Sequence, residues 1–258
     1  MTSDSPKFRL VHPIFLGIGT LSLVALQGVL PLDLPLPSPV SSVQLSPANA
    51  QYNPPKRPGF GSSEGTGTRG DKLRLCGERK TASFTTLAPT NHIGETISSR
   101  PTLFWYLSSR QTVELKLMQP GVQKPVFVTT VQVDKPGIVS LELPKTAPEL
   151  VPEKVYRWSI AVVCEDGTKD ALRMALIRRV ALIPEVKQRL AIAQSDQERG
   201  QVYAAQGLWY DAVTMFSKAA TANPKDRTAP DKLLSLLDQV GFEKVTEQER
   251  KKNQPIKR

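Results

Sequence analysis

The spacing of apolar residues changes at Pro184, and this change constrains the fold more than any other feature of the sequence. Before Pro184, apolar and polar residues alternate in short runs separated by Gly and Pro, as in half-buried β-strands. After Pro184, apolar residues recur every three or four positions, as in amphipathic helices. Strands followed by helices predict an α+β fold, with a β-sandwich domain at 73–183 and a small α-helical part at 184–242.

The β-part is expected to contain seven short strands, a number typical of an immunoglobulin-like antiparallel β-sandwich. In one of them Val113, Leu115 and Leu117 alternate with polar residues, so one face of this strand is expected to be buried and the other exposed to solvent. The expected strands cover residues 83–87, 102–107, 113–118, 126–133, 138–143, 155–164 and 172–183.

Residues 150–158 resemble the corner that precedes strand F in fibronectin type III and related sandwiches. In that corner a tyrosine hydroxyl bonds to the backbone a few residues upstream. Tyr156 is the expected corner residue, and Trp158 is expected to fill the core. The alternative is that Trp158 stacks on a sugar, but Trp158 shares its strand face with Tyr156 and Ile160, which favours the core.

The first fifty residues contain the three parts of a secretory signal peptide. Lys7 and Arg9 precede a mainly apolar stretch at 14–32, and a small-x-small site ends at Ala50. Cleavage after Ala50 would make the contact with the membrane transient and the protein periplasmic or secreted. The alternative is an uncleaved membrane anchor, because the apolar stretch approaches the roughly 20 residues that span a bilayer. Residues 51–72 are expected to be a disordered linker rich in Pro and Gly.

The chain has two cysteines, Cys76 and Cys164, which can pair in only one way in an oxidising compartment. A disulfide between them would close a long loop and stabilise the fold by about 4 to 5 kcal/mol if chain entropy dominates. The alternative is a catalytic thiol, which needs a neighbouring base. After signal cleavage His92 is the remaining histidine, and its sequence context predicts an exposed loop. The few cysteines and histidines fit no zinc-finger spacing, so no metal or other cofactor is expected.

Three helices are expected in the C-terminal part, at 184–206, 209–222 and 229–240, with Gly241 as the cap of the third. The first two resemble one tetratricopeptide repeat. A stable array needs about three repeats, so this hairpin is expected to pack on the third helix or on the sandwich. Residues 243–258 are expected to be a basic flexible tail. The residues that carry the repeat resemblance are Gly200, Tyr203, Gly207, Trp209, Ala212, Phe216, Ala219 and Pro224.

Five aromatic residues are candidates for a partner or ligand surface. Phe104, Trp105 and Tyr106 are consecutive in one expected strand, so one face or the other of that strand must present aromatic rings. Trp209 and Tyr210 begin the second expected helix. Aromatic rings of this kind would be suitable for stacking on glycan if they were exposed.

The chain resembles the cyanobacterial exported proteins catalogued as domain of unknown function 928. The resemblance covers about residues 68–242 and implies a cyanobacterial exported protein, without a catalytic residue or cofactor to carry over. It also favours pairing of the cysteines, since both lie in matching motifs. These motifs are Thr-Arg-Gly at 68–70 with Cys76, Ser-Arg-Pro-Thr-Leu-Phe-Trp-Tyr at 99–106, Pro-Gly-Ile-Val-Ser-Leu at 136–141, Tyr-Arg-Trp at 156–158 with Cys164, and Gly-Leu-Trp-Tyr-Asp-Ala at 207–212.

The leading expectation for function is an exported, non-enzymatic scaffold or interaction protein whose partner is an envelope protein or a wall polymer. The alternative is a module that binds glycan or peptidoglycan through exposed aromatic residues. A hydrolase is least favoured: four serines lie near His92 in the sequence, but the chain contains no Gly-x-Ser-x-Gly elbow. No catalytic residue is therefore assigned. The four serines are Ser98, Ser99, Ser108 and Ser109.

The formal net charge of +10 is concentrated near the two ends of the mature chain. Residues 51–80 have seven basic and three acidic residues (+4), residues 250–258 have five basic residues and no acidic one (+5), and residues 81–249 have 20 basic and 19 acidic residues (+1). Such basic ends attract anionic lipid or wall polymer. Nucleic acid is not an expected partner, because no nucleic-acid motif accompanies the charge and export removes that partner.

Overall fold

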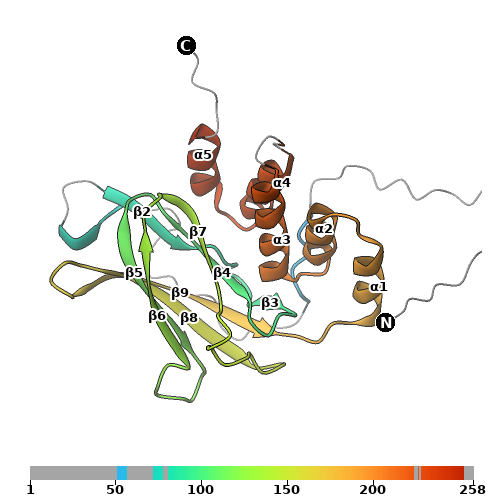
Figure 1. Ribbon diagram of the computed structural model, residues 1–258, viewed down its shortest axis with the longest axis horizontal. Helices are drawn as coiled ribbons and strands as arrows, with labels where there is room; N and C mark the ends of the chain where they lie inside the picture. Colours follow the sequence, from blue (N-terminus) through green and yellow to red (C-terminus); the bar gives the residue numbers. More distant parts are fainter. Residues whose placement is uncertain (1–50, 57–71, 78–80, 224–225, 227, 253–258) are drawn as a thin grey trace, which may run out of the picture. The chain divides into compact units, whose positions relative to one another are not determined.

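The computed structural model describes residues 51–56, 72–77, 81–223, 226 and 228–252 (Figure 1). The predicted signal peptide, its cleavage site at Ala50 and the alternative of an uncleaved anchor fall outside the described residues. Within the described residues, no helix combines the length and the apolar character that crossing a bilayer requires.

Two β-sheets form the first part of the structure. One has four strands in the order β1-β2-β4-β7, and the other has five in the order β3-β9-β8-β5-β6. Neighbouring strands are antiparallel except β3 and β9, which are parallel. The strands are β1 (Lys72–Arg74), β2 (Thr81–Thr86), β3 (Gly94–Thr96), β4 (Thr102–Leu107), β5 (Gln111–Met118), β6 (Phe127–Val133), β7 (Gly137–Glu142), β8 (Val155–Val163) and β9 (Lys169–Arg179).

The predicted α+β fold, a β-sandwich followed by helices, is confirmed. All seven expected strands are present with ends shifted by a few residues, and the largest shift is in β9, expected at 172–183. Strands β1 and β3 were not expected from the sequence. Each has only three residues, which is too short for a period of two to be recognised.

The predicted tyrosine corner is confirmed. The Val151 backbone N–H donates to the Tyr156 hydroxyl at 3.1 Å, which fixes the chain where it enters β8. Trp158 follows two residues later, and its side chain is fully buried. The alternative role of Trp158 as a platform for sugars is therefore wrong.

Five helices follow the sandwich instead of the three expected. The segment expected as one helix at 184–206 is divided, because Ser195 starts a new helix: its Oγ accepts from Glu198 N at 3.1 Å, and Glu198 Oε2 accepts from Gln194 N at 2.7 Å. This Ser-x-x-Glu pattern is a capping signature that the sequence already contained. The helices are α1 (Pro184–Ile192), α2 (Asp196–Ala205), α3 (Trp209–Ala222), α4 (Thr228–Asp238) and α5 (Glu243–Lys252).

The predicted flexible tail is wrong over residues 243–252, which form α5. Val245 and Thr246 are buried, and the Thr246 hydroxyl donates to Asp238 Oδ1 on α4. The segment is mostly hydrophilic, and its buried residues all lie in one turn of the helix. Because one turn is too short to show a helical period of apolar residues, the sequence did not indicate α5. Residues 253–258 lie outside the described residues.

The predicted linker is wrong over residues 51–56, which pack on the helices. Tyr52 is buried, and its ring meets Trp209 edge-on with the ring centres 5.1 Å apart. Its backbone N–H donates to Gln239 Oε1 at 2.8 Å, and the Asn53 N–H donates to the Ala204 carbonyl at 3.1 Å. Residues 57–71 of the expected linker lie outside the described residues.

Helices α2 and α3 form a tightly packed hairpin. A Cβ added at Gly200 would lie 2.9 Å from Phe216 Cε1, so the two helices approach too closely for a larger residue at this position. Gly200 is one of the residues that carry the repeat resemblance, but the relationship to tetratricopeptide repeats stays a prediction. Gly241 ends α4 with φ of 87°, in the left-handed region that glycine favours, as expected for a C-cap.

The helices and the sandwich share one core instead of forming separate bodies. In Figure 1 α5 lies near β2 and β7, and Gln248 of α5 accepts a hydrogen bond of 2.8 Å from the Tyr106 hydroxyl on β4. The first turn of α3 reaches the sandwich directly, since Trp209 Nε1 donates to the Leu87 carbonyl at 3.0 Å. Buried apolar residues continue from the sheets into α3, α4 and α5. The expected boundary near residue 184 therefore separates two kinds of secondary structure within a single compact unit.

Replacing Tyr156 by Phe should lower the free energy of unfolding by about 1 kcal/mol, because the Val151 N–H loses its acceptor while the ring still fills the core. Urea unfolding followed by tryptophan fluorescence measures the change. The control is Tyr203→Phe, which removes a hydroxyl without a hydrogen bond in the described part of the chain and should change stability by less than about 0.5 kcal/mol. Equal effects of the two substitutions would contradict the corner's role.

Candidate functional site

The five aromatic residues predicted to form a partner surface are buried instead. The side chains of Phe104, Trp105, Tyr106, Trp209 and Tyr210 are each at most 1% exposed. The strand that carries the first three, β4, lies between β2 and β7, with one face toward the other sheet and the other toward the helices. A strand covered on both faces has a continuous apolar run, and Leu-Phe-Trp-Tyr-Leu in β4 was the signal for it. Glycan binding through these aromatic residues is thereby excluded.

Tyr210 is instead a structural bridge between α3 and the five-stranded sheet. Its hydroxyl accepts from Trp158 Nε1 at 2.8 Å and donates to the Leu176 carbonyl at 3.0 Å. Burial raises the pKa of Tyr210, so the hydroxyl stays neutral. A Cβ added at Gly94 would lie 2.7 Å from the Tyr210 ring, so β3 needs a glycine at this contact.

His92 was expected in an exposed loop, but it is buried and both of its ring nitrogens are engaged. Nδ1 lies 2.7 Å from Asn91 Oδ1, and Nε2 lies 2.6 Å from the Tyr52 hydroxyl. Asn91 Oδ1 can only accept, so Nδ1 carries the proton and Nε2 accepts from Tyr52. Burial lowers the pKa of His92, in keeping with this neutral form. The Tyr52 hydroxyl therefore bonds to His92 Nε2, the unprotonated nitrogen that would have to act as the base in a hydrolase. Tyr52 lies just after the predicted cleavage site.

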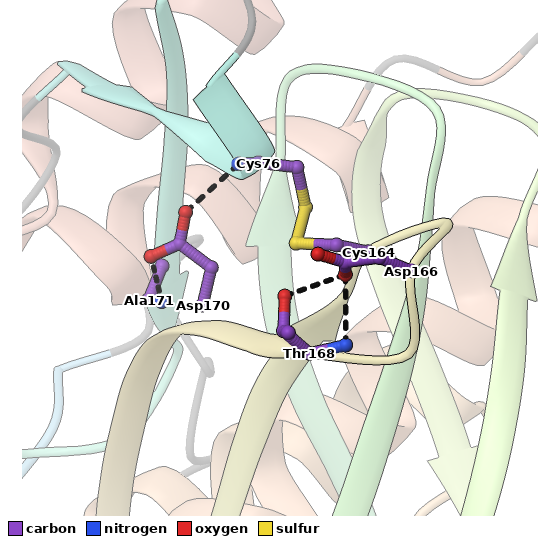
Figure 2. The surroundings of a disulfide bond; sticks show 6 residues. All are labelled: Cys76, Cys164, Asp166, Thr168, Asp170 and Ala171. Carbon is purple, nitrogen blue, oxygen red and sulfur yellow. Dashed lines mark hydrogen bonds between the residues drawn. A yellow bond between two sulfur atoms is a disulfide. The ribbon is translucent and has the colours of Figure 1, made fainter.

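The predicted disulfide is confirmed, and it ties the start of the sandwich to the end of β8 (Figure 2). Cys76 lies in the short helical turn η1 (Leu75–Gly77) after β1, and Cys164 directly follows β8, with 5.5 Å between the two Cα atoms. Both sulfurs are bonded to each other, so the alternative of a catalytic thiol is wrong. We call these two residues together with residues 165–171 the disulfide corner.

Asp170 organises one side of the disulfide corner. Its Oδ2 accepts from Cys76 N at 2.8 Å, and its Oδ1 accepts from Ala171 N at 2.7 Å (Figure 2). Cys76 and Ala171 have φ values of 52° and 51°, a left-handed conformation that costs a residue with a Cβ of the order of 1 kcal/mol. The disulfide and the two bonds to Asp170 hold both residues in this conformation.

The turn after Cys164 forms the other side of the corner. Asp166 Oδ1 accepts from the Thr168 backbone N–H at 2.9 Å and from the Thr168 hydroxyl at 2.6 Å (Figure 2). These hydrogen bonds lower the pKa of Asp166, so its carboxylate stays ionised in neutral solution. The Cys164 N–H donates to the Thr168 carbonyl at 2.9 Å and closes the turn.

A cleft of about 660 Å³ opens beside the disulfide corner. Its lining includes the exposed side chains of Arg110, Gln132 and Asp166, which offer a guanidinium, an amide and a carboxylate. Such groups can bind a polar partner by hydrogen bonds and ion pairs. Among the described residues, Asp170 and the two cysteine sulfurs form the one group of three potential metal ligands within 4.8 Å of one another. Disulfide formation removes the thiolates that would bind a metal there.

Asp211, which the sequence analysis did not single out, is a buried carboxylate where α3 meets the sandwich. Its Oδ2 accepts from Ile97 N at 3.0 Å. Burial raises the pKa of Asp211 to about 7, and the hydrogen bonds from Ile97 and Thr96 offset only part of this effect. An acid in the first turn of a helix is common at exposed N-termini, so the sequence held no signal that this one is buried.

Replacing Asp211 by Asn should remove part of the pH dependence of stability. Between the ordinary pKa of about 4 and the folded value of about 7, the folded state holds a proton that the unfolded chain lacks. The wild-type protein should therefore lose stability as pH rises through this window, and the uncharged variant should lose less. The variant keeps an amide oxygen for Ile97 N, so it should be at least as stable as the wild type at pH 8.

Urea unfolding from pH 4.5 to pH 8 measures the difference, with the exposed Asp134→Asn as the matched control. The control should follow the wild-type profile. Parallel profiles for wild type and Asp211→Asn would show that Asp211 titrates as an ordinary surface acid.

Solved structures with some similarity to this chain match it only in part. The fibronectin(III)-like modules of Clostridium thermocellum CbhA are 10% identical, cover 38% of this chain and 98% of their own, and have a TM-score of 0.25. The soluble domain of PmoD from Methylocystis sp. ATCC 49242 (Rockwell) is 10% identical, covers 39% of this chain and 93% of its own, and has a TM-score of 0.24. These similarities are too low to carry an argument about function.

A search of curated proteins finds no match to this chain. Residues 64–250 match the family described as Domain of Unknown Function (DUF928). The matched segment contains both cysteines of the disulfide corner, the tyrosine corner and all five helices except the last two residues of α5. Since this segment covers well over half of the sequence, the chain belongs to the DUF928 family.

Proposed function

We propose that this protein is an exported, non-enzymatic scaffold of the cell envelope that binds an envelope protein. The observation that carries the proposal is the disulfide between Cys76 and Cys164. Structural disulfides persist in oxidising compartments outside the cytoplasm. The three-part N-terminal segment ending at Ala50 supports the same location, and the family resemblance implies a cyanobacterial envelope.

The side chains that could act as a nucleophile, acid or base are bonded to other groups of the protein, which supports a non-enzymatic role. Both thiols are in the disulfide, and His92 is held by Tyr52 and Asn91. Asp211 has a pKa near neutral pH, as a general acid or base requires, but it is buried and bonds to the Ile97 backbone. These side chains therefore serve the packing of the molecule.

We place the protein-binding surface at the cleft beside the disulfide corner. The helical hairpin is a poorer candidate, because Trp209 and Tyr210 are packed against the sandwich. The cleft carries charges of both signs, including Arg110 and Asp166, on a backbone fixed by the disulfide. Mixed charge on a rigid surface favours recognition of another protein surface with complementary charges.

Cell fractionation combined with thiol labelling tests the location. The protein should be recovered from the envelope or the medium without residues 1–50, and its cysteines should react with an alkylating reagent only after reduction. The intact mass reports both features at once. A full-length, reduced protein in the cytoplasm would refute export.

Cross-linked capture from an envelope extract tests the cleft. A double variant with Arg110→Glu and Gln132→Ala should lose a partner that the wild type captures, because it reverses one charge and removes one amide at the cleft. The control, Lys145→Glu with Gln123→Ala, makes the same change in charge at exposed residues away from the cleft and should keep the partner. Equal capture by the two double variants would refute the cleft as the binding surface.

A further inference from the structure

A second hollow, of about 620 Å³, lies between the first strands and α5. Three lysines line it, Lys72 from β1 and Lys244 and Lys251 from α5. These elements lie near opposite ends of the described sequence, and the packing of α5 beside the four-stranded sheet brings them together. We call this feature the basic hollow.

The basic hollow joins the two segments that hold nearly all of the net charge. Strand β1 belongs to residues 51–80, with a charge of +4, and the last turn of α5 belongs to residues 250–258, with +5, while residues 81–249 carry only +1. Among the described residues that line the hollow, three are lysines and one, Glu247, is acidic, so positive charge predominates. A concave surface with one dominant sign of charge attracts a ligand of the opposite sign.

Lys251 and Glu247 form an ion pair in the basic hollow that an anionic ligand can displace. Lys251 Nζ lies 2.7 Å from Glu247 Oε1, but the two side chains are 69% and 65% exposed. Pairs as exposed as this one contribute little to stability, about 0 to 1 kcal/mol. An anionic ligand can therefore replace Glu247 as the partner of Lys251 at little cost to the fold.

Uncharged polar residues line the basic hollow beside the lysines, and hydrogen bonds connect them to the core. The Tyr106 hydroxyl donates to Gln248 Oε1 at 2.8 Å, and Gln248 Nε2 lies 3.5 Å from Ser83 Oγ. The Ser83 N–H donates to Ser108 Oγ at 2.7 Å. These hydrogen bonds link Tyr106 in the core to Gln248, Ser83 and Ser108, so the polar groups of the lining are held in fixed positions.

We propose that the basic hollow binds an acidic polysaccharide of the envelope. The lysines complement carboxylate or other acidic groups on the polymer, and the hydroxyl and amide groups among the lining residues complement sugar hydroxyls. A membrane surface fits less well, because the described lining residues include no apolar side chain to enter the lipid. The proposal deepens the scaffold function, on whose envelope location it rests, by adding a wall polymer at a site separate from the cleft.

Binding to polygalacturonate tests the proposal, with neutral dextran as the uncharged control. The protein produced from the full-length gene should bind polygalacturonate at about 50 mM NaCl and should release it as salt screens the charges. The triple variant Lys72→Ala, Lys244→Ala and Lys251→Ala should bind at least about tenfold more weakly. A second triple variant, Lys145→Ala, Lys154→Ala and Lys187→Ala, removes the same charge from exposed positions elsewhere and should bind within about twofold of the wild type.

Several outcomes would overturn the proposal. If the two triple variants lose the same amount of binding to polygalacturonate, binding responds to net charge alone. If the wild type binds dextran as tightly as polygalacturonate, the acidic groups of the polymer have no role. Vesicles of phosphatidylglycerol and the acidic peptide polyglutamate are the rival ligands. If either one binds more tightly than polygalacturonate through the same three lysines, it is the ligand of the basic hollow and the polysaccharide is not. Urea unfolding checks that both variants stay folded. If the protein does not bind the polysaccharide but still captures a protein partner at the cleft, the scaffold function stands and only the proposal for the basic hollow is refuted.

Discussion

The docking of the first turn of α3 into the sandwich holds the molecule together. Trp209 donates to the Leu87 carbonyl after β2, and the Tyr210 hydroxyl joins Trp158 on β8 to the Leu176 carbonyl on β9. The side chains of Trp158, Trp209 and Tyr210 are buried, where a polar group left without its partner costs about 1 to 3 kcal/mol. Helices and sheets are thus linked by contacts that neither part can satisfy alone.

This docking also decides which surfaces remain for partners. The helices cover the large aromatic residues of β4, and residues 51–56 cover Trp209 from the other side with Tyr52. The surface of these large aromatic residues is therefore used within the molecule. The cleft at the disulfide corner and the basic hollow offer charged and hydrogen-bonding groups to a partner. Attraction between charges at these two surfaces would act at longer range than apolar contact and would weaken as salt is added.

Much of the fold could be predicted because its signals are local. The alternating pattern in β5 and the segment that leads to Tyr156 each depend on residues close together in the chain. The break before α2 was equally local, since Ser195 and Glu198 form a capping pair, but the apolar stripe on either side of it hid the signal. The site was less predictable: Asp211 and His92 are ordinary polar residues in the sequence, and only their burial makes them unusual.

The sequence by itself determined that strands precede helices, that only one disulfide is possible and that positive charge is concentrated near the two ends of the mature chain. Only the tertiary structure decided that the aromatic residues are buried, that α5 is a helix and that Lys72 lies near Lys251. The reason is physical: periodicity reports which face of an element is apolar, but not which other element covers it. That choice depends on contacts between residues more than one hundred positions apart, such as those of Trp209 with Leu87 and of Tyr106 with Gln248.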